Sequence, residues 1–199
     1  MIVPYRGKWP KIHETAFVAP SADLIGDIEI GSNSSIWFQC VIRADVNFIR
    51  IGNNTNIQDH SMLHVNRGNC PLHIGNHVTV GHRVMLHGCT IGNLVLVGMG
   101  VIVLDNADIG DECLIGAGSL VTQRMKIPPR SLVLGSPAKV IRPLNEQELA
   151  FLPKSAANYV ADGIEYHGYV PGPARLGMNQ SDLDFFVDDF PGNFGGDDR

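Results

Sequence analysis

Three histidines, His64, His82 and His87, lie close together in the sequence and are the residues best suited to chemistry. Imidazole nitrogens bind zinc and other first-row metals, so a metal centre is the first hypothesis. The spacing of five between His82 and His87 differs from the helical HExxH arrangement, in which the two histidines are four residues apart. Whether the three side chains meet therefore depends on the elements that carry them.

Those elements follow from a repeat. An aliphatic residue recurs at every sixth position over about a hundred residues, which is far longer than chance allows. The repeated positions are Val18, Leu24, Ile30, Ile36, Ile42, Ile51, Ile57, Leu63, Ile74, Val80, Leu86, Ile91, Val97, Val103, Ile109, Ile115 and Val121. Such a period is typical of a parallel β-helix in which three hexads form one coil. The pattern resembles the left-handed hexapeptide-repeat family, and the predicted handedness comes from that resemblance.

One residue is missing from the period between Leu86 and Ile91, after which the register continues. Two interruptions with extra residues also break the period, one between Ile42 and Ile51 and one between Leu63 and Ile74. We expect both to be loops that leave a corner of the coil. The residue two before each aliphatic position is mostly small, as a tight coil requires. Cys40, Cys89 and Cys113 occupy such positions, so we interpret them as packing residues, because small buried thiols behave as hydrophobes. Cys70 falls in the second interruption, and its role stays open.

A helix is expected after the repeat. The Pro128-Pro129 turn and the Gly135-Ser136-Pro137 turn after it are expected to end the coils, since such turns stop regular pairing. Asn145 followed by Glu148 predicts a helix N-cap and a helix over 146–166 that packs along the β-helix. The domain prediction is a β-helix over 1–127, a linker and helix over 128–167, and an extended or disordered tail, or one draped over a neighbour, over 168–199.

Composition excludes several classes of partner. The formal net charge is -5 and the pI is about 5.8, so no basic surface is expected for nucleic acid or for anionic lipid. The N-terminal residues contain no apolar run of the length that a signal peptide or membrane span needs. The expectation is a cytoplasmic enzyme or binding protein without nucleic acid or membrane partners.

The register predicts which polar residues meet. Ile42, Leu63 and Leu86 begin the same side of three successive coils, so Arg43, His64 and His87 should stack. Successive coils lie about 4.8 Å apart, and two nitrogens on one tetrahedral zinc ion lie about 3.3 Å apart. Two stacked histidines can therefore share one metal ion.

His82 follows Val80 on the preceding side, and the five extended residues that separate it from His87 span about 16 Å. A third ligand would then come from another chain, and closed threefold symmetry would complete three equivalent sites. Asp45 and the run Asn56-Ile57-Gln58-Asp59 supply a polar cluster beside these histidines. The competing interpretation is that the histidines are ordinary polar residues at the edges of a repeat.

The match to one family is specific. Its residues are Arg43-Ala44-Asp45, Asn56-Ile57-Gln58-Asp59, His64, Gly81-His82 and Leu86-His87-Gly88-Cys89. Together they resemble the signature of the γ-class carbonic anhydrases, over about residues 10–165. The resemblance implies a homotrimer that holds Zn2+, or Fe2+ or Co2+, between His64 and His87 of one subunit and His82 of its neighbour. Three histidines with an open position suit metal-bound hydroxide attack on carbon dioxide, giving bicarbonate.

The same resemblance assigns roles to further residues. Gln58 would orient hydroxide or carbon dioxide, Arg43 and Asp59 would pair across the interface, and Asp45 would join that network. The alternative for this network, which Asn56 adjoins, is adhesion between subunits. Tyr159 on the predicted helix is a candidate to approach the metal pocket, with Tyr166 a weaker choice and helix packing the alternative role.

Two departures from the family prototype concern proton transfer. Val46 stands where the prototype has a glutamate, and the acidic loop is replaced by Asn66-Arg67-Gly68-Asn69. We therefore expect weak or latent hydratase activity. Two other functions are kept as alternatives: a coenzyme A thioester hydrolase or acyltransferase-like enzyme, and a metal-stabilised assembly subunit without catalysis.

Overall fold

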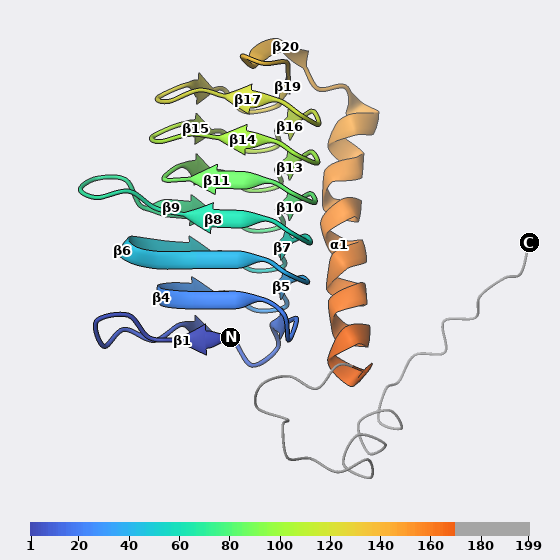
Figure 1. Ribbon diagram of the computed structural model, residues 1–199. Coiled ribbons are helices and arrows are strands. Elements are labelled where there is room, and N and C mark those ends of the chain that lie inside the picture. Colours follow the sequence, from blue (N-terminus) through green and yellow to red (C-terminus); the bar gives the residue numbers. More distant parts are fainter. Residues whose placement is uncertain (170–199) are drawn as a thin grey trace, which may run out of the picture.

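The computed structural model describes residues 1–169, which form a stack of triangular coils with one long helix alongside (Figure 1). The strands on the front of the stack run one way and those behind them return, so that the chain rises as a left-handed coil. The predicted left-handed parallel β-helix with a C-terminal helix is confirmed. Most of the predicted tail, residues 170–199, lies outside the described part of the chain.

Each side of the triangle is a ladder of parallel strands. The first ladder contains β3 (Phe17–Val18), β5 (Ser35–Ile36), β7 (Asn56–Ile57), β10 (Thr79–Val80), β13 (Leu96–Val97), β16 (Leu114–Ile115) and β19 (Ser131–Leu134), and antiparallel β20 (Lys139–Pro143) closes it. The second contains β1 (Ile2–Val3), β4 (Asp23–Ile30), β6 (Val41–Ile51), β8 (Met62–His64), β11 (Met85–His87), β14 (Ile102–Val103) and β17 (Leu120–Val121). The third contains β2 (Lys11–Ile12), the ends of β4 and β6, β9 (Leu72–Ile74), β12 (Thr90–Ile91), β15 (Asp108–Ile109) and β18 (Lys126–Ile127).

The predicted register is confirmed on all three sides. In the second ladder, Ile42, Leu63, Leu86 and Val103 are mutual neighbours in successive coils, and each is fully buried. The small positions two residues before the aliphatic ones are buried as well, including Cys40, Cys89 and Cys113. These thiols pack in the core, and burial raises the pKa of Cys40 to about 11. Apolar stacking along the axis therefore holds the coils together.

The coils extend at both ends beyond the repeated positions, which run from Val18 to Val121. Ile12 pairs with Ile30, and Ile127 and Val133 continue the six-residue register after Val121. The coils therefore run past the Pro128-Pro129 turn and end at the second expected turn, Gly135-Ser136-Pro137, after which antiparallel β20 closes the ladder. Proline lacks an amide donor, and a corner between two ladders does not require that donor.

The two interruptions behave differently. The segment between Ile42 and Ile51 is not a loop, because β6 runs through it as one strand with an irregularity opposite Gly26 and Ile28 of β4. That expectation was wrong. The second interruption does leave the coil as a loop, closed by a bridge between Asn66 and Cys70.

The corners need unusual backbone conformations. Left-handed φ values between 53° and 61° occur at non-glycine corner residues such as Asn54, His77, Arg83 and Asn106. One corner instead carries glycines in successive coils, at residues 31, 52, 75, 92 and 110. A Cβ added at Gly75 would lie 2.7 Å from the backbone of Gly92, so this column depends on close backbone approach.

Replacing Gly75 by alanine is expected to destabilise the stack by about 1–3 kcal/mol, because the added methyl group must push two coils apart. The measurement is thermal unfolding of the full chain followed by circular dichroism. Gly168→Ala is the control, because a Cβ there meets nothing within 4 Å and glycine weakens a helix. Equal melting temperatures for Gly75→Ala and the unsubstituted protein would contradict the close-approach argument.

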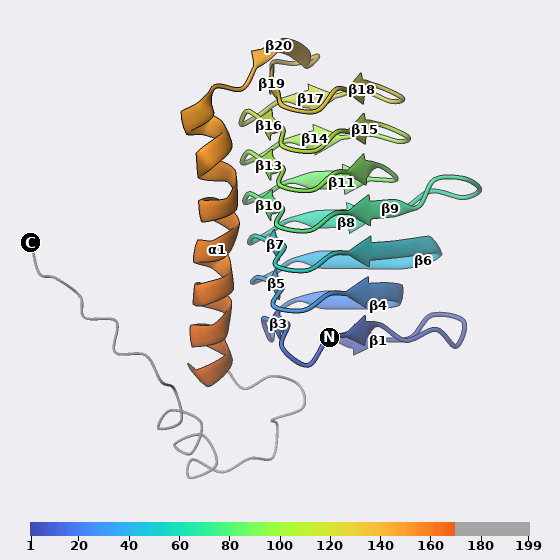
Figure 2. The same ribbon diagram turned by 180° about the vertical axis from the view of Figure 1, so that it is seen from behind.

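The helix α1 (Glu146–Tyr169) runs along the first ladder, opposite in direction to the rise of the coils (Figure 2). Its N-cap is the predicted reciprocal pair: Glu148 N donates to Asn145 Oδ1 and Asn145 N donates to Glu148 Oε2, both at 2.8 Å. The helix ends three residues later than expected. Leu152 and Ala156 are buried against the coils. No helix within residues 1–169 has the length and apolar character needed to span a membrane.

Candidate metal centre

His64 and His87 lie side by side at the ends of β8 and β11, as the register predicted. The Nδ1 atom of His64 is 3.1 Å from Nε2 of His87, and the ring centroids are 5.1 Å apart. Arg43 occupies the corresponding position of β6, one coil below His64. Strand pairing therefore brings three polar side chains into one column on the surface.

A carboxylate holds the far side of each of these two rings. Asp45 Oδ1 lies 3.0 Å from Nε2 of His64, and Asp105 Oδ1 lies 2.5 Å from Nδ1 of His87. The second Asp105 oxygen accepts a 3.1 Å hydrogen bond from Nδ2 of Asn66. The two ring nitrogens that remain, Nδ1 of His64 and Nε2 of His87, are those that face each other.

Charge compensation keeps both carboxylates ionised. Burial alone would raise the pKa of Asp45, but the hydrogen bond with His64 and the charge and hydrogen bond of Arg43 lower it below its ordinary value. The pKa of Asp105 is lowered in the same way, since the hydrogen bonds with His87 and Asn66 outweigh its burial. Ionised acceptors favour histidine tautomers that leave the opposite ring nitrogen available to a metal.

His82 lies at the corner after β10, on a different side of the triangle, with Nδ1 2.9 Å from Asp59 Oδ2. Asp59 also accepts a hydrogen bond from the Phe38 amide. Within residues 1–169, no hydrogen bond or ion pair links this pair to His64 or His87. The candidate residues thus fall into two groups, each with its own carboxylates.

Gln58 precedes Asp59 and is almost fully buried. Its Nε2 donates to Asn56 Oδ1 at 3.1 Å, and Asn56 Nδ2 donates to Thr79 Oγ1 at 3.1 Å. Thr79 Oγ1 lies 3.0 Å from Ser155 Oγ on α1. This chain fixes the Gln58 side chain from behind, and Asn56 is the residue that connects it to the helix.

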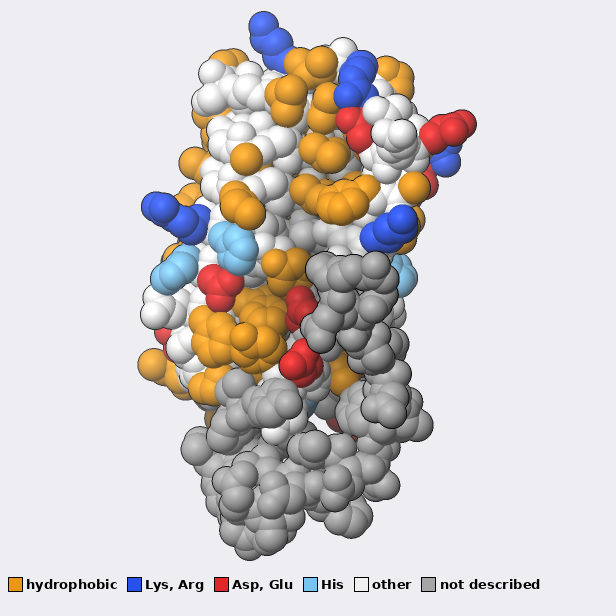
Figure 3. Space-filling model, turned by 90° about the vertical axis from the view of Figure 1, so that its right-hand side faces the viewer, with side chains coloured by type: hydrophobic (Ala, Val, Ile, Leu, Met, Phe, Trp, Pro, Cys, Tyr) orange, Lys and Arg blue, Asp and Glu red, His pale blue; other side chains and the backbone are white. Residues whose placement is uncertain are grey.

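Tyr159 of α1 packs edge-on against Trp37, with ring centroids 5.6 Å apart. Burial, followed by the charges of Asp162 and Asp59, raises its pKa. Tyr166 instead packs among Phe17, Trp37 and Phe38. Seen from the side that carries α1, histidine and acidic side chains lie beside a hydrophobic patch (Figure 3).

The spacing of two nitrogen donors within this chain fits a divalent metal such as zinc. The 3.1 Å between the facing nitrogens of His64 and His87 is close to the about 3.3 Å expected for two nitrogens on one tetrahedral ion. No group of three histidine, cysteine or carboxylate side chains in residues 1–169 converges within the single chain. Two facing nitrogens alone leave the coordination incomplete.

Sequence reasoning missed Asp105, Asn66 and the position of Cys70. The repeat register places Val103 above Leu86, and Asp105 two residues later therefore falls at the corner above His87. That signal was present in the sequence. Asn66 and Cys70 could not be placed, because they belong to the loop that interrupts the repeat.

Comparisons with known proteins give first the class and then the family. Residues 88–123 match the family model for bacterial transferase hexapeptide repeats. A crystal structure described as a putative acetyltransferase from Bacillus cereus superposes with a TM-score of 0.82 at 47% identity, covering 83% of this chain and 96% of that one. The chain is thus a hexapeptide-repeat β-helix protein.

Sequence relatives define a narrower family within this class. A carbonic anhydrase from Geobacillus kaustophilus is 49% identical over 166 residues, covering 83% of this chain and 91% of the relative. Gamma carbonic anhydrase 1 of Arabidopsis thaliana is 45% identical over 157 residues, covering 76% of this chain. The chain belongs to the γ-class carbonic anhydrase family. The aligned region spans 57% of the Arabidopsis protein's length.

Proposed function

We propose that this protein catalyses the reversible hydration of carbon dioxide to bicarbonate at a zinc site shared between subunits of a homotrimer. The observation that carries the proposal is the pair of facing nitrogens on His64 and His87, 3.1 Å apart, each ring held from behind by a carboxylate. His82 of a neighbouring subunit would supply the third nitrogen. Fe2+ or Co2+ could replace zinc in the same donor set.

The metal would supply Lewis acidity, which makes a water molecule nucleophilic near neutral pH. The protein's own groups would orient the reactants. The Gln58 amide oxygen accepts no hydrogen bond from residues 1–169, while its nitrogen is fixed by Asn56. That oxygen can accept a hydrogen bond from the attacking water. A lone pair of the water oxygen would then point at the carbon of the substrate.

The ion pairs would serve both assembly and orientation. Arg43 pairs with Asp45 within one chain, and Asp45 in turn holds His64. Across a trimer interface Arg43 would also reach Asp59, which holds His82. Tyr159, which packs edge-on against Trp37, would form one wall of the pocket together with it.

Proton removal is where this protein would differ from the family prototype. Val46 packs partly against the core and carries no titratable group. The loop at 66–69 contributes asparagines and an arginine in place of acidic residues. Proton transfer to buffer would then depend on solvent, and turnover would be slow and sensitive to buffer concentration.

The deciding experiment is stopped-flow carbon dioxide hydration by anaerobically purified full-length protein, with metal content measured in the same sample. We expect activity that rises with zinc occupancy and with buffer concentration. Hydrolysis of coenzyme A thioesters is assayed in parallel. A fully zinc-loaded trimer that hydrates no carbon dioxide above background would overturn the proposal, and thioester turnover or a metal-stabilised assembly role would replace it.

A further inference from the structure

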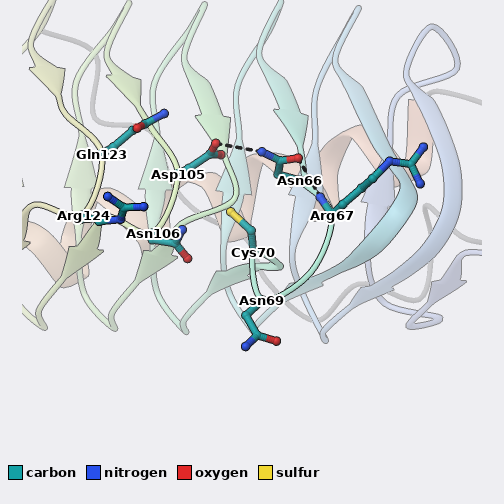
Figure 4. A pocket seen from close by; sticks show the side chains of 8 residues that line it. All are labelled: Asn66, Arg67, Asn69, Cys70, Asp105, Asn106, Gln123 and Arg124. Carbon is teal, nitrogen blue, oxygen red and sulfur yellow. Dashed lines mark hydrogen bonds between the residues drawn. The ribbon is translucent and has the colours of Figure 1, made fainter.

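Asp105 uses both of its carboxylate oxygens at the edge of the candidate metal centre. Oδ1 lies 2.5 Å from Nδ1 of His87. Oδ2 accepts the 3.1 Å hydrogen bond from Asn66 (Figure 4). The Asp105 side chain is only 17% exposed. With one oxygen bound on each side, the carboxylate cannot rotate without losing a contact.

The loop that interrupts the repeat is what holds Asn66 in place. The backbone N–H of Asn66 donates to the backbone carbonyl of Cys70 at 3.1 Å. Asn47 Nδ2 of β6 donates to the carbonyls of Asn66 and Gly68, at 3.1 and 2.8 Å. Hydrogen bonds thus join the extra residues of β6 to the loop, and together they direct the Asn66 side chain toward Asp105.

The backbone at Gly88 allows this approach. Its φ is +53°, and a Cβ there would lie 2.3 Å from Cys70 Sγ and 2.9 Å from Asp105 Oδ1. Cys70 Sγ also donates to the Gly88 carbonyl at 3.2 Å. The buried thiol and the carboxylate therefore fit only because residue 88 has no side chain.

We propose that Asp105, fixed by Asn66 of the inserted loop, is a positioning residue that orients the His87 ring for metal binding. A carboxylate that accepts from Nδ1 keeps the proton on that nitrogen and leaves the Nε2 lone pair available. That Nε2 is the atom facing His64. The inference rests on the proposed metal site and adds a supporting residue to it. The loop outside the repeat would set the orientation of a ligand inside the repeat, His87.

The test is Asp105→Asn, which keeps the shape of the side chain and changes its hydrogen-bonding groups. Its amide has one acceptor and one donor end, so it cannot accept from both His87 and Asn66. We expect zinc affinity, measured by competition with a chelator, to fall by about 10–100-fold. Asn66→Ala should weaken binding in the same direction but less. The visible spectrum of the cobalt-loaded protein should change in both variants, which a role in folding alone would not produce.

Asp108→Asn is the matched control, because Asp108 is exposed on the same coil and its side chain makes no hydrogen bond or ion pair with residues 1–169. It should bind zinc like the unsubstituted protein. Zinc affinity of Asp105→Asn within twofold of the unsubstituted protein, with the same cobalt spectrum, would overturn the inference. Failure of the proposed function has a different signature: zinc binds and responds to Asp105→Asn, but no carbon dioxide is hydrated.

Discussion

His82→Ala should abolish both stoichiometric zinc binding and carbon dioxide hydration, even though His82 has no contact with His64 or His87 in the described chain. Removing one of three nitrogen ligands should cost more than the about 10–100-fold in affinity that loss of a supporting residue costs. The zinc content after dialysis against a weak chelator is the measurement. His77→Ala is the control, because His77 lies at another corner, where its ring is near Asn54.

A mixing experiment shows whether the site is shared. In a cyclic trimer containing both His82→Ala and His87→Ala subunits, one interface always joins an intact His82 to an intact His64 and His87 pair. Random mixing of equal amounts, by refolding or coexpression, should therefore restore about a quarter of the zinc bound per chain. If both single variants lose zinc and their mixture recovers none, the ligands belong to one chain and the shared site is wrong.

The fold could be predicted almost completely because its stabilising pattern is local and repeated. Each aliphatic residue packs on the equivalent residue one coil away, so the six-residue period determines the partner as well as the element. Val80, for example, has Ile57 below it and Val97 above it. The same logic placed His64 beside His87, since polar residues inherit the height and side of their aliphatic neighbours.

Prediction failed where residues stand outside the period. An interruption shows that extra residues exist, but not whether they leave the sheet, and β6 retains its extra residues within one strand. The hydrogen bonds between Asn47 and the loop residues Asn66 and Gly68 depend on side-chain geometry that no period encodes. Asp105 was predictable in height but not in partner, because its second hydrogen bond comes from that loop.

The second large effect concerns Gln58. Replacing it by alanine is expected to lower kcat by about 10²–10³-fold, the cost typical of removing one oriented hydrogen-bonding group at a reacting centre. Zinc affinity should stay unchanged, because the three histidines and their carboxylates are untouched. The measurement is stopped-flow hydration beside zinc content, with Gln147→Ala on the exposed first turn of α1 as the control.

A second variant distinguishes an orienting role of Gln58 from a packing role. Gln58 is nearly buried, and within residues 1–169 its side-chain amide nitrogen donates to Asn56 alone, so a loss of activity could also follow from collapse of the hydrogen-bond chain to Thr79 and Ser155. Asn56→Ala breaks that chain while leaving the Gln58 side chain in the protein. If Gln58 orients the reactants, Asn56→Ala should retain far more activity than Gln58→Ala. Equal losses in the two variants, or full activity in Gln58→Ala, would show that the chain serves helix docking and that another group orients the water.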